Sequence, residues 1–200
     1  MSSAGELLSI EPDGVFGEGV LSTELYSITV DPKNNTLYVA DSSSKSISAF
    51  NLANNNKELK DKKIKGIGPL GLAIFKDILY AADWGSNSIR AFDLAGNKEL
   101  EDKKIEGITP YGLAIFKDIL YAGDEEDSSI RAFDLADNNK KLKDKKIKGL
   151  IEPYDLAIHK GRLYITDSAA FKDAEGGPVS SSGGIRRYKL KFKEQEKSIK

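Results

Sequence analysis

The sequence predicts an all-β fold in which small four-stranded sheets are repeated around a common axis, the arrangement called a β-propeller. The first observation behind this prediction is a tyrosine-aspartate signature that occurs four times, as LYVAD, LYAAD, LYAGD and LYITD. The second is its spacing, since successive aspartates are 42, 41 and 43 residues apart, at Asp41, Asp83, Asp124 and Asp167. The third is that the residues around each signature follow strand patterns. A period near forty with strand content is typical of propeller blades.

Residues 69–109 illustrate one repeat, and their pattern predicts four strands per blade. GLAIF and ILYAA are short apolar runs joined by a tight turn at Lys76-Asp77, which indicates two strands covered on both faces. SIRAFDL alternates polar and apolar residues, as a third strand with one wetter face does. After the polar loop AGNKELEDK, KIEGI predicts a short outer strand. The gradient from apolar to charged places the first strand near the axis and the last one at the solvated edge.

We expect a single domain over residues 1–200, with blades at approximately 24–66, 69–107, 110–149 and 153–193. The N-terminal residues 6–21 hold two strand-like runs around a Pro-Asp-Gly turn, which predicts either a partial blade or a strand that closes the ring. At this period, 200 residues make fewer than five blades. A closed four-blade ring, an incomplete ring and a ring completed by another chain therefore all stay open.

The composition is that of an ordinary soluble globular chain and excludes several classes of protein. Charged residues make up 30% of the chain, yet the net charge is −1, so there is no concentrated positive field for nucleic acid. No apolar run approaches the roughly 18 residues that span a bilayer. No secretory signal is visible at the N-terminus. We therefore expect no nucleic-acid or membrane partner, and a protein that is either cytoplasmic or secreted after removal of a leader.

Cysteine and histidine chemistry is nearly absent from the chain. There is no cysteine, which excludes disulfides, thiolate metal sites and cysteine nucleophiles. The single histidine, His159, excludes multi-histidine metal sites and is expected on a surface turn. Because no set of acid, base and nucleophile is assembled in the sequence, we expect a non-enzymatic function.

The two middle repeats differ almost entirely at one end of the blade. Residues 69–95 and 110–136 align without gaps, and 21 of 27 positions are identical. Five of the six differences are Leu70 against Tyr111 and the loop WGSN (84–87) against EEDS (125–128). In a propeller, the start of the first strand and the loop between strands two and three lie on the same rim. Variation is thus concentrated at one mouth of the ring, where loops carry binding residues.

Aromatic and acidic side chains are predicted to line this mouth. A tyrosine or leucine stands before the core of each first strand, and Trp84 lies on a neighbouring loop. Aromatic groups with a polar handle are enriched in recognition sites. We therefore predict a site for a protein or peptide partner formed by Tyr26, Leu70, Trp84, Tyr111, Glu125, Glu126 and Tyr154. The alternative interpretation is that these rings merely plug the top of the channel.

Carboxylates at the same mouth suggest a second use for it. Residues 124–127 place four carboxylates in succession, and such oxygen ligands bind hard cations like Ca²⁺. A cation there would draw ligands from several blades, and the candidates are Asp83, Asp124, Asp127 and Asp167. A solvated acidic loop, and aspartates that accept backbone N–H bonds at the turn, form the structural alternative. We expect no cofactor, with Ca²⁺ or another divalent cation as the alternative.

The repeats resemble two branches of the six-bladed propellers. PYGLAIFKDILYAGD and ILYAADWGSNSIRAFDL are similar to the class-B (YWTD) repeats of lipoprotein receptors. NTLYVADSSSKSISAFNL resembles NHL repeats and the gluconolactonase–regucalcin family. The resemblance covers nearly the whole chain, but the tryptophan of YWTD is replaced in every copy, by Val39, Ala81, Ala122 and Ile165. Members normally have six blades, so the short chain is a departure.

The gluconolactonase branch implies a divalent cation in the central funnel and a catalytic aspartate that ends a second strand. The four signature aspartates match that position. The asparagine that the resemblance implies at the start of the first strand is replaced by Leu70, Tyr111 and Tyr154, which are poor ligands for such a cation. We therefore favour a binding or scaffold propeller, with a metal-dependent lactonase or hydrolase as the alternative. A third hypothesis is a propeller fragment that self-associates to complete its ring.

Overall fold

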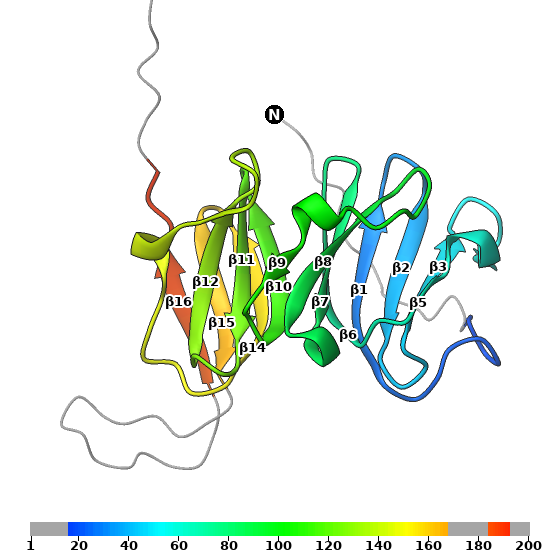
Figure 1. Ribbon diagram of the computed structural model, residues 1–200. Coiled ribbons are helices and arrows are strands. Elements are labelled where there is room, and N and C mark those ends of the chain that lie inside the picture. Colours follow the sequence, from blue (N-terminus) through cyan, green and yellow to red (C-terminus); the bar gives the residue numbers. More distant parts are fainter. Residues whose placement is uncertain (1–15, 168–183, 193–200) are drawn as a thin grey trace, which may run out of the picture.

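The computed structural model describes residues 16–167 and 184–192, and the statements below refer to these residues. They form four antiparallel β-sheets that follow one another along the chain and stand in a row (Figure 1). We call these sheets blades 1 to 4. The helical segments in the described residues are single 3₁₀ turns. None of them is long enough to cross a membrane.

The blades contain the following elements. Blade 1 consists of β1 (Leu25–Asp31), β2 (Thr36–Asp41), β3 (Ser46–Asn51), β4 (Lys57–Glu58), the 3₁₀ turn η1 (Lys60–Lys62) and β5 (Ile64–Lys65). Blade 2 consists of β6 (Pro69–Phe75), β7 (Ile78–Asp83), η2 (Trp84–Ser86), β8 (Ser88–Asp93), η3 (Glu101–Lys103) and β9 (Ile105–Glu106). Blade 3 consists of β10 (Pro110–Phe116), β11 (Ile119–Asp124), β12 (Ser129–Asp134), β13 (Lys140–Lys141) and η4 (Lys143–Lys145). Blade 4 consists of β14 (Pro153–His159), β15 (Arg162–Asp167) and β16 (Gly184–Lys189).

The sheets hold five, four, four and three strands in the described residues, whereas the sequence predicts four in each. In blade 1 the outer strand is divided into β4 and β5, which pair with opposite ends of β3 on either side of η1. Single bridges take the corresponding places in blades 2 and 3, at Phe92–Glu99 and Ile130–Ile147. The two pieces of the outer strand are short because the lysine-rich stretch between them leaves the sheet to form the 3₁₀ turn.

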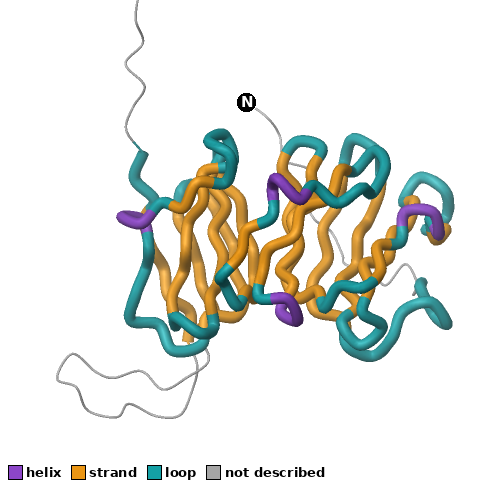
Figure 2. The backbone as a smooth tube through the Cα atoms, in the orientation of Figure 1, coloured by secondary structure: helices purple, strands orange, loops and turns teal. Residues whose placement is uncertain are grey.

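The alternating strand directions sort the loops onto two rims. The rim that faces down in Figure 1 carries the starts of the first strands and the loops between second and third strands, and we call it the mouth rim. The loops 84–87 and 125–128 lie on this rim, as the sequence predicts. The other rim carries the first hairpin turns and the lysine-rich loops 54–63, 96–104 and 137–146. Figure 2 shows both sets of loops joining the strands.

The first strands β1, β6, β10 and β14 lie next to one another along the row. Two glycines permit their close approach. A Cβ atom on Gly71 would lie 2.4 Å from the backbone oxygen of Tyr111, and one on Gly112 would lie 2.4 Å from that of Tyr154. Both distances are far below van der Waals contact, so no other residue fits without a backbone shift. These glycines therefore set how near successive mouth residues lie.

Apolar side chains fill the junctions between successive blades. We call the face of a blade that packs on the preceding blade its leading face, and the opposite one its trailing face. The leading face of blade 2 carries Leu72, Ile74, Leu79, Ala81, Phe92 and Leu94 and packs on blade 1. Its trailing face carries Ala73, Tyr80, Ala82, Ile89 and Ala91 and packs on blade 3. Both sets alternate along the same strands, which is why the inner strands are apolar on both faces.

Blades 1 and 4 stand at the two ends of the row, and the described residues of one chain do not close a ring (Figure 1). Of the predicted N-terminal element at 6–21, only residues 16–21 are described, and they form a loop and turn rather than a strand. This segment packs on Leu37, Val39 and Phe50 of blade 1. Residues 6–15 of that element, and residues 168–183 and 193 of the predicted last blade, lie outside the described part of the chain.

Candidate functional site

The four signature aspartates end the second strands at the mouth rim, and their side chains are buried. Each one accepts a hydrogen bond from a backbone N–H of the segment that leads into its own blade. The donors are Ser22 to Asp41 at 2.9 Å, Gly68 to Asp83 at 3.0 Å, Thr109 to Asp124 at 3.2 Å, and Ile151 and Glu152 to Asp167 at 3.0 and 2.9 Å. The aspartates therefore fix the chain as it crosses from one blade to the next.

In blades 2, 3 and 4, an arginine on the third strand pairs with the signature aspartate of the same blade. Arg90 lies 3.3 Å from the Asp83 carboxylate, Arg186 donates to Asp167 at 2.6 Å, and Arg131 forms an ion pair with Asp124. The sequence analysis did not identify these arginines. A signal was present, because the arginine follows the aspartate by seven residues in both middle repeats.

Blade 1 holds its signature aspartate without an arginine. Ser48 occupies the corresponding position on β3, opposite Val39, and Asp41 is held by Ser22 and Ser44 instead. Burial works against the charged form of Asp41, but the hydrogen bonds from Ser22 and Ser44 together outweigh it and hold its pKa below the ordinary value. In blade 3, burial prevails over the attraction of Arg131 and raises the pKa of Asp124.

The candidate metal ligands do not converge on one point in the described residues. Asp83, Asp124 and Asp167 belong to three different blades, and each is already engaged by backbone N–H groups and an arginine. Asp127 lies in the exposed loop of blade 3 and pairs with Lys146 and, at 3.3 Å, with Arg131. Lys146 chiefly lowers the pKa of the Asp127 carboxyl. Within residues 16–167 and 184–192, no three Asp, Glu, His or Cys side chains converge as a metal site would require.

The aromatic residues of the mouth form a connected cluster instead. The Trp84 indole N–H, on the loop of blade 2, donates to the Glu125 carboxylate of blade 3 at 2.8 Å. The rings of Tyr111 and Tyr154, on blades 3 and 4, have centroids 4.7 Å apart with planes tilted by 46°. Burial, and after it the neighbouring Glu125 and Tyr154, raises the pKa of Tyr111. Three blades thus contribute to one ridge, which we call the mouth cluster: Trp84, Tyr111, Glu125 and Tyr154.

The other predicted binding residues lie around this cluster. Glu126 is exposed on the same loop as Glu125, and Leu70 is half-buried at the start of β6. Tyr26 is exposed on β1, at the end of the row. Trp84 and Tyr154 remain 51% and 44% exposed.

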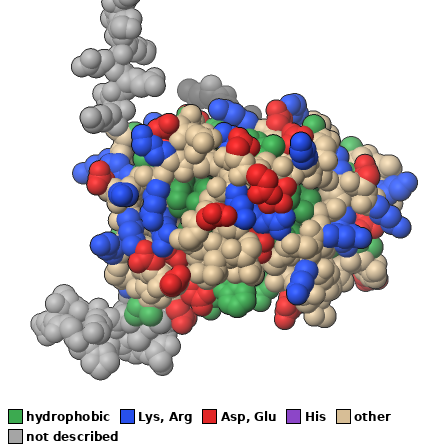
Figure 3. All heavy atoms as spheres, viewed as in Figure 1, with side chains coloured by type: hydrophobic (Ala, Val, Ile, Leu, Met, Phe, Trp, Pro, Cys, Tyr) green, Lys and Arg blue, Asp and Glu red, His purple; other side chains and the backbone are tan. Residues whose placement is uncertain are grey.

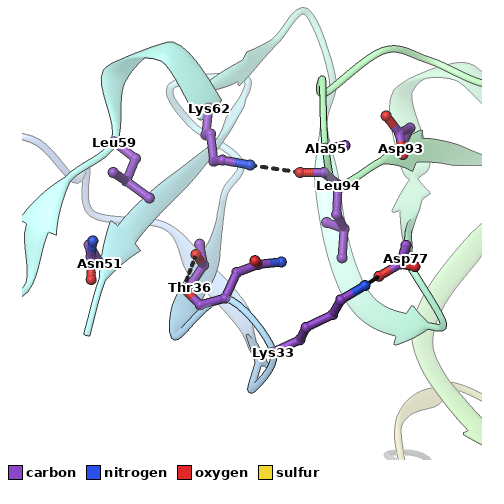
Figure 4. Close-up of a pocket in the computed structure, with 10 residues that line it drawn as sticks. Lys33, Thr36, Asn51, Leu59, Lys62, Asp77, Asp93, Leu94 and Ala95 are labelled. Atoms are coloured by element: carbon purple, nitrogen blue, oxygen red, sulfur yellow. Dashed lines mark hydrogen bonds and ion pairs between the residues drawn. The ribbon is translucent and has the colours of Figure 1, made fainter. Parts of the chain in front are cut away.

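The opposite rim holds a groove that the sequence analysis did not predict. It has a volume of about 540 Å³ and lies between blades 1 and 2 (Figure 4). Lys62 donates to the backbone oxygen of Leu94 at 2.6 Å, and Lys33 pairs with Asp77 at 2.7 Å, so both lysines are used to join the blades. Basic and acidic side chains are interspersed over the face shown in Figure 3.

Comparison with known proteins shows the fold and no more. No protein-family model and no curated protein match the sequence. Among solved structures, the hydrazine synthase of Kuenenia stuttgartiensis aligns with a TM-score of 0.61 and 18% identity over 88% of this chain and 53% of its own. A nidogen–laminin complex aligns with a TM-score of 0.57 and 20% identity over 72% and 56%. A putative 6-phosphogluconolactonase from Bacteroides uniformis aligns with a TM-score of 0.60 and 14% identity over 82% and 57%.

The chain spans about half the length of these structures. Identities of 20% or less support a common architecture and carry no residue roles. The specific resemblance to YWTD, NHL or gluconolactonase repeats is therefore not established by these matches. The row of four antiparallel sheets, with its solved neighbours, makes this chain a protein of the β-propeller class.

Proposed function

We propose that this protein is a non-enzymatic binding module and that its mouth cluster recognises a cationic segment of a protein or peptide partner. The observation that carries the proposal is the hydrogen bond from Trp84 to Glu125, which joins the loops of two blades into a single exposed surface. Tyrosine and tryptophan supply large contact areas and a polar handle, which is why they dominate recognition hot spots. The solved neighbour in which nidogen and laminin form a complex is consistent with a protein partner.

The charge of the cluster supports the class of partner. Glu125, which accepts the hydrogen bond from Trp84, is followed along the loop by the exposed carboxylate of Glu126. A lysine or arginine of the partner can pair with these carboxylates while its stem packs on the indole ring. The carboxylates at the rim are expected to speed association and to add specificity more than affinity.

The test uses the fact that Trp84 is the only tryptophan of the chain, so its fluorescence reports on the site directly. We would select twelve-residue peptides from a random display library on the wild-type protein. Trp84 emission would then be titrated with the selected peptides and with copies in which Lys and Arg are replaced by Gln. We expect a consensus rich in Lys or Arg, and affinity reduced roughly tenfold or more, about 1.4 kcal/mol, by the Gln copies or by Glu125→Gln.

A matched control is Glu152→Gln, which changes a carboxylate outside the cluster and should leave the affinity within about twofold. Binding in the Trp84→Ala variant would be followed by calorimetry, since its fluorescence signal is lost. The proposal is wrong if the selected peptides bind Trp84→Ala as tightly as wild type, or if selection enriches no cationic sequence.

A further inference from the structure

The two ends of the blade row expose residues that every internal blade buries. Ile28 on β1 is 67% exposed, whereas the corresponding leucines of the next three blades, Leu72, Leu113 and Leu156, are 5–7% exposed. Ile185 on β16 is 73% exposed, whereas its counterparts Ile47, Ile89 and Ile130 are 0% exposed. Large exposed apolar positions of this kind mark an interaction surface.

The exposed end of blade 1 is a leading face without a blade in front of it. The strand registers match its residues one by one to those of blade 2. In that order, Ile28, Val30, Leu37, Val39, Phe50 and Leu52 correspond to Leu72, Ile74, Leu79, Ala81, Phe92 and Leu94. In blade 2 this set forms one core with the trailing face of blade 1. Blade 1 thus presents half of a blade junction.

The exposed end of blade 4 is a trailing face without a blade behind it. Its Ala157, Tyr164 and Ile185 repeat Ala73, Tyr80 and Ile89, which face blade 3 from blade 2. Thr166 and Arg187 stand where blade 2 has alanines. Blade 4 therefore presents the other half of the junction, with a more polar edge at two positions.

The N-terminal residues 17–20 form a hydrogen-bonded turn at the place where each later blade receives the outer strand of the blade before it. Gly19 has a φ of +72° and open space around it, as do Gly66, Gly107 and Gly149, which end the outer strands of blades 1 to 3. The apolar residue after each glycine fills a junction: Ile67, Ile108 and Leu150 pack with the leading face of the next blade. Val20 packs in the same way on the leading face of blade 1.

Blade 4 has no outer strand in the described residues. In blades 1 to 3, the counterparts of Ile185 pair with Ile64, Ile105 and Ile147 of the outer strand. In blade 4, β16 pairs only with β15 among the described strands. A single chain does not bring the two ends together, because Ile28 and Val30 on one end and Ile185 on the other stay exposed.

We propose that two copies of this chain associate head to tail into a closed ring of eight blades. The trailing face of blade 4 of each copy packs on the leading face of blade 1 of the other, and residues 17–20 of one copy, extended from their turn, complete blade 4 of its partner. A second copy is the occupant because the two faces are complementary halves of a junction that the chain already forms three times. Propellers close with four to eight blades, so two copies are the number that closes the ring.

The internal junctions also predict polar contacts between the copies. Tyr80 donates to Asn139 of the next blade at 3.5 Å, and the corresponding pair across the new junction is Tyr164 with Asn56 of the other copy. The backbone N–H of Leu72 donates to Ser27 of the preceding blade at 3.2 Å. Asp155 stands at the Ser27 position of blade 4, where it can accept from the Ile28 N–H of the other copy.

The first experiment measures mass in solution by light scattering on the full chain, over a range of concentrations. We expect a plateau at twice the chain mass of 21.9 kDa. Ile28→Asp and Ile185→Asp should each weaken the association roughly 100-fold or more, because an aspartate is then buried in an apolar junction. Both residues are exposed in the single chain, so circular dichroism and cooperative urea unfolding should show that the variants fold. Trp84→Ala, at the mouth, is the matched control and should stay dimeric.

The second experiment tests the arrangement by cross-linking, which the absence of cysteine makes simple. In blades 1 and 2, the residue before the glycine that ends the outer strand pairs with the first residue of the third strand, Lys65 with Ser46 and Glu106 with Ser88. Glu18 and Gly184 hold these two positions, so Glu18 should lie opposite Gly184 of the other copy. Oxidation of the Glu18→Cys/Gly184→Cys variant should give a covalent dimer, whereas Glu18→Cys/Lys189→Cys should not. A monomeric wild type, a mass that rises without a plateau, a ladder of cross-linked species or a dimer unaffected by both aspartates would each overturn the proposal.

Discussion

Arg131 and Asp124 form an ion pair across the neighbouring strands β12 and β11, at the mouth end of blade 3. The carboxylate is fully buried, and the guanidinium also donates to the backbone oxygen of Gly107 at 2.5 Å. Gly107 belongs to the chain that leads from blade 2 into blade 3. One charged pair therefore joins two strands and the connection between two blades.

We predict that Arg131→Ala destabilises the fold by about 3–5 kcal/mol, since it leaves the buried Asp124 carboxylate without its counter-charge. Urea unfolding followed by circular dichroism measures this change. The control is Lys140→Ala, which removes an exposed pair with Asp137 and should cost no more than about 1 kcal/mol. Equal midpoints for the two variants would contradict the structural role of the Arg131–Asp124 pair.

Gly71→Ala should be strongly destabilising, by about 3 kcal/mol or more, because its methyl group would meet the Tyr111 backbone oxygen at 2.4 Å and push β6 away from β10. Gly96→Ala is the matched substitution, as its methyl group would meet an ordinary contact at 3.6 Å. We expect it to change the free energy of unfolding by about 0.5 kcal/mol or less. Thermal unfolding of both variants decides whether close strand approach is required.

Asn139 joins blades 2 and 3 at the rim opposite the mouth. Its side-chain amide donates to the backbone oxygen of Lys103 at 2.5 Å, and its oxygen accepts from Tyr80 at 3.5 Å. Asn139→Ala should cost about 1–3 kcal/mol more than Asn138→Ala, because it leaves buried polar groups unpaired. Both asparagines have positive φ, so the difference between the variants removes the shared backbone strain. Equal losses in chemical denaturation would show that the Asn139 contacts add nothing.

Tyr38 should make stability depend on alkaline pH. Burial, and to a lesser degree the nearby Asp31, raises the pKa of Tyr38 from 10.0 to about 12. Because the folded state keeps the phenol protonated, its contribution is complete below pH 10 and is lost as pH rises from 10 to about 12. The loss is on the order of 2 kcal/mol.

The measurement is the free energy of unfolding in urea at several pH values across that range. Tyr38→Phe should flatten the decline, whereas Tyr26→Phe, on an exposed ring, should leave it unchanged. The pKa values of Tyr80 and Tyr121 are raised by burial too, so part of the slope will persist. A Tyr38→Phe profile that overlays the wild type would refute the assignment.

Local pattern accounts for most of the blade architecture. The apolar runs, the tight turn at Lys76-Asp77 and the signature aspartates each have a local cause, so strand order and the placement of variable loops on one rim follow from the repeat. The outer strands were less predictable, because they consist of only two residues each in the described chain. Pairing that short depends on the neighbouring strand rather than on its own sequence.

The site was predictable in its residues but not in its contacts. Trp84 and Glu125 are 41 positions apart, and the pairing of Tyr111 with Tyr154 depends on the glycines that bring β10 and β14 together. Only the fold shows that the aspartates predicted as cation ligands are already paired with arginines. An arginine seven residues further along the chain looks like a surface residue until the strand pairing places it beside the buried aspartate.

The sequence by itself determined four repeated β-sheets and the rim on which they vary, since hydrophobic periodicity and turn residues act over a few neighbouring positions. Only the tertiary structure decided which aspartate meets which arginine, which aromatic rings share a surface, and that the first and last blades expose unpaired junction faces. The aromatic surface depends on contacts between segments some forty residues apart, and the aspartate–arginine pairs depend on how neighbouring strands pair. No local pattern encodes how many blades surround the axis.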